Sequence, residues 1–267
     1  MSQNATTESD LAPGAVLQLL RTRRMGRSYE FLSACASTND VVRSHAAAGA
    51  AEGLLVVADR QTAGRGRLGR SWHSPPGQNL YLSLLLRPAM PARHAAPLTL
   101  LAGAALARTL AEAGLAPRLH WPNDLLFPAA GGFRKAAGIL TEMATDGERV
   151  RYIVLGVGLN VNGLEFPPDL AERATSLRMA CGRAFDRAQL LVDFSAVFES
   201  IYDDFLARGP AAGLAGWRRY ADLGRTCRID QDGARVEGIA TDIDESGALL
   251  VRDEAGCVHR MISGESY

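Results

Sequence analysis

The sequence is poor in lysine and cysteine, and it has no long apolar run. Lysine and arginine together number 29, yet Lys135 is the only lysine. The four cysteines are scattered without metal-ligand spacing, which predicts reduced packing thiols in a cytoplasmic protein. These are Cys35, Cys181, Cys227 and Cys257. No apolar stretch reaches membrane-spanning length and the first residues are polar, so neither a membrane span nor a signal peptide is predicted.

Charge of one sign is not in excess either. The formal net charge is +0, which argues against a surface built to follow DNA phosphates. A hydrophobic content of 47% over 267 residues is enough for the core of one large domain or two. The composition therefore predicts a folded protein without a membrane or DNA partner.

The single lysine suggests a site that needs one compact cation. Arginine offers a broad, weakly hydrated fork, whereas lysine offers a strongly hydrated point charge on a flexible stem. A site that places one small cation against a carboxylate or a phosphate would distinguish the two. The alternative is that Lys135 merely survived a compositional bias.

A second feature is a loop in which glycine alternates with arginine. Residues 64–70 read Gly-Arg-Gly-Arg-Leu-Gly-Arg. Glycine lets the backbone approach a ligand closely, and three guanidinium groups repel one another unless a polyanion is present. Apolar segments at 54–58 and 80–86 flank the loop, so we expect it at a sheet end, where α/β proteins place ligands. The alternative is a solvated basic surface loop or a nonspecific nucleic-acid patch.

Hydrophobic periodicity predicts an α+β fold. Strands are expected at 29–34, 56–59 and 79–87, the last with leucines alternating on one face, and an antiparallel hairpin at 137–143 and 150–161. Helices are expected at 14–22, 41–48, 97–113 and 186–206, while residues 1–12 are expected to be disordered. Hydroxyl and amide side chains at 37–40 would cap the second helix, and Asp186 would cap the last.

The spacing of apolar segments and turn residues changes from about Ala221. Short strands are expected at 225–230, 235–244, 248–253 and 257–262, with tight turns at 232–233, 246–247 and 255–256. Such closely spaced short strands predict a small barrel. We therefore expect an N-terminal segment at 1–25, partly disordered, a main domain at 26–220 and a small C-terminal domain at 221–267.

Five segments, taken in order, resemble the signature segments of biotin protein ligase, also called biotin–[acetyl-CoA-carboxylase] ligase. The resemblance implies a mixed-sheet catalytic domain like those of class II aminoacyl-tRNA synthetases and lipoate ligases, followed by an SH3-like β-barrel. It also indicates the short form, because the segment before residue 29 is too short for a winged helix-turn-helix. The segments are Ser-Thr-Asn at 37–39, the loop at 64–72, Trp-Pro-Asn-Asp-Leu at 121–125, Lys-Ala-Ala-Gly-Ile-Leu-Thr-Glu at 135–142 and Gly-Val-Gly-Leu-Asn-Val-Asn at 156–162.

The resemblance further implies a reaction in two steps. Biotin and ATP, with Mg²⁺, give biotinoyl-5′-adenylate and pyrophosphate, and the acyl group then passes to a lysine of a biotin carboxyl carrier domain of acetyl-CoA carboxylase or a related carboxylase. The number of metal ions and the metal ligands stay open. A monomer or weak homodimer that binds neither DNA nor a membrane is expected.

In the first step a carboxylate approaches an α-phosphate. Two unit negative charges about 4 Å apart repel by about 4 kcal/mol at an effective dielectric near 20. That repulsion would slow the step by about three decades, so fixed cations are needed. The resemblance assigns this role to Arg65, Arg67 and Lys135, and it places Asp124 near the ribose, phosphate or metal.

The remaining site residues are assigned by the same resemblance. A helix N-terminus at 37–39 presents free N–H groups that suit the polar ureido head of biotin, although a plain cap is the alternative. The biotin site would consist of Ser37, Thr38, Asn39, Gln61, Gly64, Arg65, Gly66, Arg67, Lys135 and Gly138. The nucleotide site would consist of Arg65, Arg67, Arg70, Trp72, Asn123, Asp124, Lys135, Gly156, Gly158 and Asn160. For Trp72 a core position, for Asn123 an Asx turn and for the glycines a β-bulge are the alternatives.

One residue departs from the family pattern. His120 stands where the family usually has a lysine before Trp-Pro-Asn-Asp, so a fixed charge is lost at neutral pH. Two other functions also fit the sequence. A lipoate or octanoyl ligase shares the fold, and a biotin store or nucleotide-binding module would bind without releasing pyrophosphate.

Overall fold

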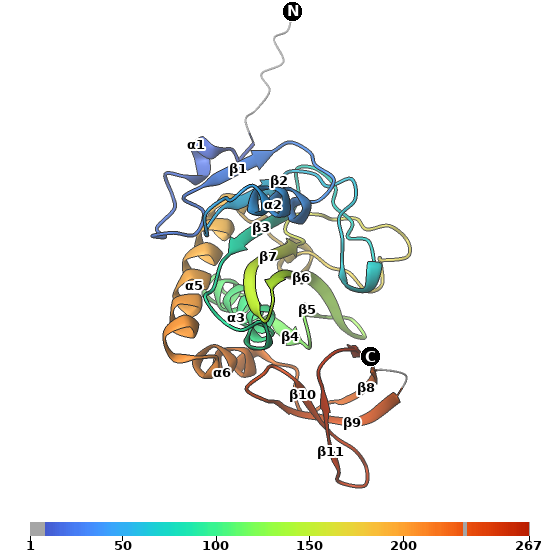
Figure 1. Cartoon of the computed structure of the whole chain (residues 1–267). Coiled ribbons are helices and arrows are strands. Elements are labelled where there is room, and N and C mark those ends of the chain that lie inside the picture. The colour runs from blue at the N-terminus through green and yellow to red at the C-terminus, as the bar shows by residue number, and fades with distance from the viewer. Residues whose placement is uncertain (1–8, 232–233, 267) are drawn as a thin grey trace, which may run out of the picture.

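The computed structural model describes residues 9–231 and 234–266, which form two sheets and a layer of helices (Figure 1). The larger sheet has seven strands in the order β1-β2-β3-β7-β6-β5-β4. β1 runs parallel to β2 and every other neighbouring pair is antiparallel, so the sheet is mixed. Its strands are β1 (Tyr29–Leu32), β2 (Leu55–Ala58), β3 (Leu80–Leu86), β4 (Arg118–His120), β5 (Asp124–Ala129), β6 (Gly132–Asp146) and β7 (Arg149–Leu159).

Helices cover this sheet on both faces. α3 packs against α5 and α6 on one side, while α2 lies across β2, β3 and β7 on the other (Figure 1). The helices are α1 (Pro13–Val16), α2 (Thr38–Ala47), α3 (Pro97–Glu112), α4 (Leu177–Cys181), α5 (Arg187–Arg208) and α6 (Ala211–Tyr220), with short 3-10 turns η1 (Arg67–Gly69) and η2 (Ala92–His94).

The strand expected at 79–87 is confirmed as β3, and its alternating leucines share one core as expected, but all seven of its residues are buried. Leu82 and Leu84 belong to the large core under α3 and α5, whereas Leu85 packs with Val42 and Ala46 of α2 in a second, smaller core. A central strand covered on both faces has no solvent side to alternate toward. The site described below lies on the α2 face of this sheet.

α3 and α5 begin where they were expected, whereas α2 begins at Thr38, before the expected start at 41. Asp186 caps α5 by accepting a hydrogen bond from the backbone N–H of Gln189, as expected. Ser37 occupies the N-cap position of α2, yet its side chain makes no cap bond. The N–H of Thr38 donates instead to Oε1 of Gln61 at 2.8 Å. A side chain from the loop therefore takes the place of the local cap.

Two expectations for the N-terminal region were wrong within the described residues. Residues 9–12 are ordered: Leu11 is fully buried and the carboxylate of Asp10 pairs with Arg187. The helix expected at 14–22 ends at Val16. The expected disorder of residues 1–8 concerns a part of the chain outside the described residues.

Several elements were not predicted, among them β4, β5 and α6. β4 and β5 flank Pro122, and β5 contains Pro128, a residue that normally argues against a strand. α6 contains Gly213 and Gly216, which lower helix propensity. Each of these segments is held by its neighbours in the sheet or by α3, so tertiary contacts override the local signal.

The second sheet is antiparallel with the order β11-β10-β9-β8-β12. Four of its five strands match the expected positions, while the expected turn at 232–233 lies outside the described residues. Its strands are β8 (Thr226–Gln231), β9 (Ala234–Ile243), β10 (Leu249–Arg252), β11 (Val258–Met261) and β12 (Glu265–Ser266).

The cysteines are all free, but they do not share one role. Cys227 is buried, and burial raises the pKa of its thiol. Cys181 and Cys257 are exposed, so the expectation that all four are packing residues was wrong for these two. Among the described residues, none of the helices combines the length and apolar character that crossing a membrane requires.

Candidate functional site

The N-terminus of α2 forms a polar corner with the loop that follows β2. Gln61 accepts hydrogen bonds from both the N–H and the hydroxyl of Thr38, at 2.8 and 3.2 Å. Its amide nitrogen donates to Ser74 at 3.2 Å. The hydroxyl of Ser83, on the neighbouring strand β3, lies 2.7 Å from the Thr38 hydroxyl and 2.6 Å from Oδ1 of Asn39, and its single proton is donated to one of these two oxygens. These residues are thus fixed by one another rather than by solvent.

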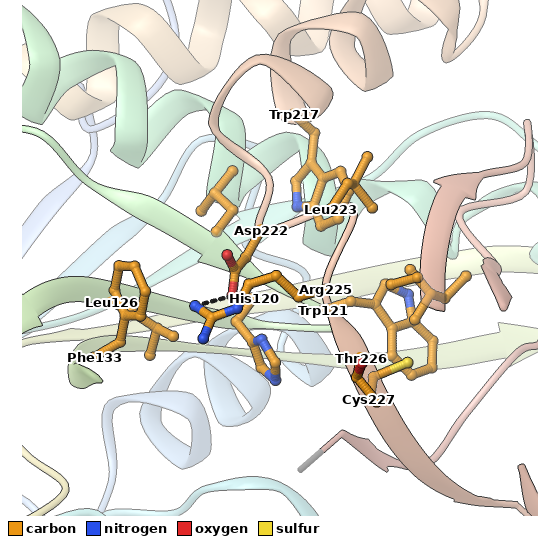
Figure 2. Close-up of a pocket in the computed structure, with 13 residues that line it drawn as sticks. His120, Trp121, Leu126, Phe133, Trp217, Asp222, Leu223, Arg225, Thr226 and Cys227 are labelled. Carbon is orange, nitrogen blue, oxygen red and sulfur yellow. Dashed lines mark hydrogen bonds and ion pairs between the residues drawn. The ribbon is translucent and has the colours of Figure 1, made fainter. Parts of the chain in front are cut away.

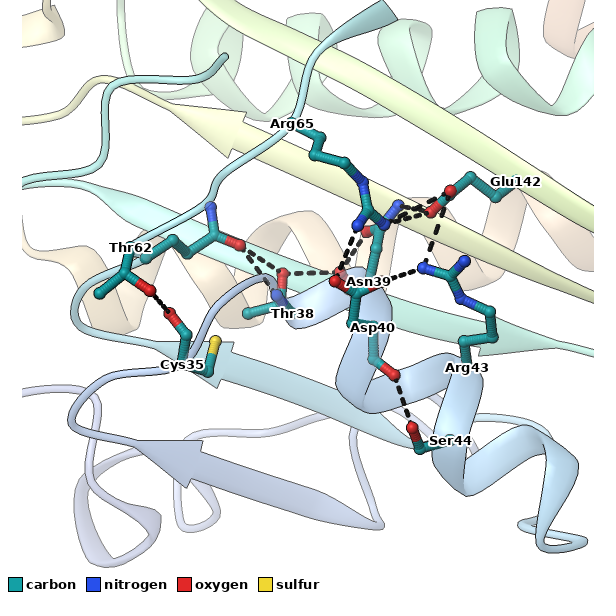
Figure 3. A network of polar contacts seen from close by, with 11 residues as sticks. Cys35, Thr38, Asn39, Asp40, Arg43, Ser44, Thr62, Arg65 and Glu142 are labelled. Carbon is teal, nitrogen blue, oxygen red and sulfur yellow. Dashed lines mark hydrogen bonds and ion pairs between the residues drawn. The ribbon is translucent and has the colours of Figure 1, made fainter. Parts of the chain in front are cut away.

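Asn39 reaches across the sheet because Gly156 has no side chain. A Cβ on Gly156 would lie 2.2 Å from Oδ1 of Asn39. On its other side, Nδ2 of Asn39 donates to Glu142 of β6 at 2.6 Å. Asn39 and Glu142 are both labelled in Figure 3. The glycine of β7 is therefore needed for an amide from α2, and that amide is oriented by a carboxylate from β6.

Arg65 is held by acidic residues in this structure. It donates to Asp40 at 2.7 Å and approaches Glu142 at 3.3 Å, while Arg43 also pairs with Asp40 (Figure 3). Burial lowers the pKa of Arg65, but the carboxylates of Asp40 and Glu142 outweigh it, so its pKa lies above the ordinary value. The guanidinium stays charged and lies at the surface of the polar corner.

The glycine–arginine loop folds back on itself. Gly66 N–H donates to the carbonyl of Arg70 at 2.7 Å, and Trp72 N–H donates to that of Gly64 at 2.8 Å. Leu68, at its tip, has a positive φ of 54° and is 71% exposed. The apolar side chain at the tip therefore has no buried packing of its own, and the loop is held by backbone bonds and by the contacts of its arginines.

The side chain of Arg67 contacts two segments that are distant in sequence, one at Asn123 and one at Gly264. One of its nitrogens lies 3.3 Å from Oδ1 of Asn123, and both terminal nitrogens lie 3.3 Å from the carbonyl oxygen of Gly264. Asn123 in turn donates to the carbonyl of Ile139 at 2.9 Å. Arg67 thereby joins the loop to the Trp-Pro-Asn-Asp segment and to the second sheet.

Lys135 pairs with Asp124 across β5 and β6. The distance from Nζ to Oδ1 is 2.6 Å, and the two side chains are 34% and 25% exposed. The ammonium also lies 5.4 Å from the centre of the Trp72 ring, within cation–π range. Asp124 follows Asn123 directly, so the pair lies next to the Arg67 contact.

Trp72 lies over two paired glycines of the hairpin. Gly138 of β6 faces Gly158 of β7, and a Cβ on either would lie 3.2 or 2.5 Å from the indole ring. The indole Nε1 is buried and has no hydrogen-bond partner within the described part of the chain. In this structure Trp72 thus covers the glycines, and its N–H is left to donate.

A groove of about 710 Å³ opens beside these clusters. Its lining includes Arg65, Arg67, Asn123 and Glu142, together with residues 246–248, Arg260 and Ile262 from the C-terminal part of the chain. Residues 139–146 of β6 pair with β7, while the described pairing of β5 with β6 ends at Gly138. Ile139 is still hydrogen-bonded to Asn123, so the groove runs along an edge of β6 that has no second partner strand among the described residues from Leu140 onward.

His120 faces a different space. It lines a cavity of about 220 Å³ together with Trp121, Phe133 and the ion-paired Asp222 and Arg225 (Figure 2). The groove that contains Arg65 and Arg67 does not include His120 in its lining. The residue that departs from the family pattern thus lies between the two sheets.

The structure brings together most of the residues selected from sequence. Thr38, Asn39 and Gln61 form the polar corner, and Arg67 and Lys135 converge near residues 123–124. Three other selected residues do not take part in these two clusters. Arg70 is exposed, Ser37 is buried without a cap bond, and Asn160 is buried and donates to the carbonyl of Thr175 at 3.0 Å.

Asp40, Ser83 and Glu142 were missed as site residues. Glu142 ends one of the recognised segments, and Asp40 follows the Ser-Thr-Asn segment, so a signal was present for both. Ser83 lies on a strand whose leucines dominate the pattern. Among the described residues no three His, Cys, Asp or Glu side chains gather in a way that could hold a metal ion.

Comparison with known proteins gives two family matches. Residues 32–160 match the model described as biotin/lipoate A/B protein ligase family, and residues 222–265 match the biotin protein ligase C-terminal domain. The chain is 38% identical over 241 residues to the bifunctional ligase/repressor BirA of Bacillus spizizenii, covering 89% of this chain and 73% of that protein. It is 34% identical to the biotin–[acetyl-CoA-carboxylase] ligase of Mycobacterium tuberculosis, covering 88% of this chain and 86% of that protein.

A solved structure is similar over nearly its whole length. It is the biotin protein ligase from Aquifex aeolicus in complex with biotin and ATP, with a TM-score of 0.78 and 28% identity. The superposition covers 90% of this chain and 98% of that one. Both sheets described above are therefore part of the shared architecture.

Proposed function

The chain belongs to the biotin protein ligase family, and we propose that it activates biotin with ATP and transfers it to a lysine of a carrier protein. A carboxylate oxygen of biotin attacks the α-phosphorus of ATP, and pyrophosphate leaves. The carrier's amine then attacks the acyl carbon of biotinoyl-5′-adenylate and loses a proton, and AMP leaves. An amide bond is formed and one ATP is consumed.

The observation that carries this proposal is the convergence of two cations on residues 123–124. Lys135 contacts Asp124 at 2.6 Å, and Arg67 contacts Asn123 at 3.3 Å. Two approaching anions need fixed positive charge at the point where they meet, and a preorganised cation stabilises the transition state more than a mobile one. We assign Lys135 to the reacting carboxylate and phosphate, and Arg67 to the phosphate and to closure of the loop.

Arg65 is proposed to join them when the substrates bind. Its present partners, Asp40 and Glu142, hold the guanidinium at the rim of the same groove that Arg67 lines. An incoming phosphate offers a stronger anionic partner than a half-exposed carboxylate. Closure of the glycine-rich tip, with Gly64 and Gly66 as its first residues, would exclude water from the reactive adenylate.

The polar corner is proposed to hold biotin. A ureido group has one carbonyl acceptor and two N–H donors, and Ser37, Thr38, Asn39 and Gln61 supply donors and acceptors from one helix start and one loop. Ligands without these groups would leave buried polar atoms unpaired, which is a strong source of selectivity. Gly138 and the stem of Lys135 would line the path from the corner to the reacting carboxylate.

The nucleotide is proposed to lie beyond Trp72. The indole N–H is the donor that is left without a partner among the described residues, and Gly156 and Gly158 lie on the strand beneath. Asn160 follows that strand and Arg70 follows the loop tip. We assign Arg70, Asn123, Asp124 and Asn160 to this side of the site.

Magnesium is proposed to enter with ATP. The donor set suits this, because Mg²⁺ keeps several waters and binds through one or two carboxylates plus phosphate oxygens, and Asp124 supplies one carboxylate beside Lys135. When bound, the metal would neutralise phosphate charge. Asp124 and the nucleotide phosphates would hold it.

The carrier domain is proposed to dock at the open edge of β6. Residues 140–146 offer backbone groups beside the groove, and the groove leads to the proposed reacting cation Arg67. We further propose that residues 26–220 form a catalytic domain like those of class II aminoacyl-tRNA synthetases, that 221–267 form an SH3-like domain, and that the protein is a monomer or weak homodimer in the cytoplasm.

One incubation tests the whole proposal. The protein is mixed with ATP, Mg²⁺, labelled biotin and a purified carrier domain, and covalent label on the carrier is scored. Label is expected with the parent carrier and none with a carrier whose acceptor lysine is replaced by arginine. Binding of biotin without pyrophosphate release would indicate a biotin store instead, and a calorimetric titration in which lipoate binds tighter than biotin would indicate a lipoate ligase.

A further inference from the structure

Arg187, the first residue of α5, is a buried cation that has no role in the function proposed above. Its side chain is 6% exposed. We infer that Arg187 is a positioning residue that clamps both ends of the loop at 61–78, and so fixes Gln61 and the glycine–arginine tip over the site. The loop joins the antiparallel neighbours β2 and β3, so it leaves and re-enters the sheet at the same end of these two strands.

The guanidinium touches both ends of the loop. Nη1 donates to Oδ1 of Asp59 at 3.0 Å and to the carbonyl of Asn79 at 3.1 Å. Asp59 directly follows β2, and Asn79 directly precedes β3. A single nitrogen thus joins the residue where the loop begins to the residue where it ends.

Further bonds spread from these two residues into the loop. Oδ2 of Asp59 accepts the backbone N–H of Gly77 at 3.0 Å. The amide of Asn79 donates to the hydroxyl of Tyr81 at 2.9 Å, and that hydroxyl donates to the carbonyl of Pro75 at 3.0 Å. The return limb of the loop is therefore fixed at two points that both depend on the Arg187 contacts.

Gln61 lies two residues beyond Asp59, and its side chain holds the start of α2. A shift of Asp59 would therefore move a wall of the proposed biotin corner, and it would also free the tip that carries Arg65 and Arg67. Arg187 contacts none of these residues directly in the hydrogen-bond network. Its effect on ligand binding would act through the loop.

The charge balance explains why the clamp needs a cation. Asp59 is 21% exposed and Asp10 is 44% exposed, and Arg187 pairs with both. Burial lowers the pKa of Arg187, but the two carboxylates raise it above the ordinary value, so the guanidinium stays charged. Without it, two carboxylates would share a partly buried space, and a buried charge left without its partner is strongly destabilising.

The decisive experiment is limited trypsin digestion without ligands, with cleavage sites identified by mass. The loop itself carries trypsin sites at Arg65, Arg67 and Arg70. In Arg187→Met, cleavage within the loop is expected to be about tenfold faster than in the parent, because local opening sets the cleavage rate. This part needs no enzymatic activity, so it tests the clamp even if the proposed function fails.

A second readout rests on the proposed function. Release of labelled biotinoyl-5′-adenylate into the filtrate is expected to rise about tenfold in Arg187→Met, and the KM for biotin to rise more than kcat falls. Arg187→Lys keeps the charge but not the fork, and it is expected to restore part of both properties.

Glu199→Gln is the matched control. Glu199 lies on the same helix and ties it to the backbone of Arg23, Arg24 and Met25, far from the loop in the hydrogen-bond network. It is expected to lower stability without faster loop cleavage. Equal loop cleavage in Arg187→Met and the parent overturns the inference, as does equal acceleration in Glu199→Gln. If Arg187→Met does not fold, Asp59→Asn is digested instead. Faster loop cleavage in Asp59→Asn than in the parent supports the inference, and equal cleavage overturns it.

Discussion

Nζ of Lys135 lies 2.6 Å from Oδ1 of Asp124, so the only lysine of the sequence is paired with a carboxylate from the neighbouring strand. The contact holds the ammonium in place, and we propose that a ligand oxygen replaces the carboxylate of Asp124 when the substrates bind. Arginine at this place would be bulkier and would seek a bidentate partner. We propose that this pairing is the reason a compact cation stands at this position in a chain that otherwise uses arginine.

Lys135→Ala is expected to lose adenylate synthesis by about a hundredfold to a thousandfold, which is the usual cost of removing one preorganised electrostatic contact in a transition state. The measurement is biotin-dependent exchange of labelled pyrophosphate into ATP. Lys135→Arg serves as the charge-retaining control and is expected to recover only part of the rate. An alanine variant that exchanges at close to the parent rate, with its fold intact by circular dichroism, removes Lys135 from the mechanism.

Arg67→Gly is expected to make adenylate but to retain it poorly. Arg67 joins the loop tip to Asn123 and to Gly264, so its loss frees the tip. Release of labelled adenylate should rise about tenfold, because closure no longer excludes water. Arg228→Ala, an exposed arginine of β8 paired with Glu237, is the matched control. Equal retention in the two variants would contradict the role of Arg67.

Gly156→Ala is expected to weaken biotin binding by at least about tenfold, because the new Cβ would meet Oδ1 of Asn39 at 2.2 Å and displace the amide. Calorimetric titration with biotin measures the effect. Gly216→Ala is the control: it lies in α6, and its nearest neighbour is 3.8 Å from the new Cβ. Unchanged biotin affinity in Gly156→Ala would show that the Asn39 amide is not needed.

Glu199 is expected to make stability depend on pH in the acid range. Burial raises the pKa of this carboxyl, but the backbone N–H groups of Arg23, Met25 and Arg24 outweigh it, so its pKa lies below the ordinary value of 4.5. A depressed folded-state pKa means that the unfolded chain binds the proton first as pH falls. The contribution is therefore full above about pH 4.5 and is lost on acidification.

Urea unfolding of the parent and Glu199→Gln checks this expectation. The parent should be the more stable of the two at neutral pH, and the difference should shrink as the pH falls toward about 3. A difference that stays constant from neutral to acid pH would show that the carboxylate charge is not what stabilises the turn at 23–25.

Much of the site could be selected from sequence because its residues occur in short segments with strong local signals. The Gly-Arg-Gly-Arg loop and the single lysine stand out in composition alone, and the order of five segments indicated the family. The strands and helices with clean periodicity, such as α3 and the β6–β7 hairpin, were also predicted. Elements interrupted by proline or glycine, such as β5 and α6, were not.

The sequence by itself determined which residues carry charge, which segments alternate or repeat as strands and helices, and which cation is chemically distinct. Only the tertiary structure decided that Gly156 makes room for Asn39, that Glu142 holds both Asn39 and Arg65, and that Arg187 reaches both ends of the loop. Each of these contacts joins residues far apart in the chain. Local propensity acts over a few neighbouring residues, whereas these contacts form only once the sheet has brought distant segments into register.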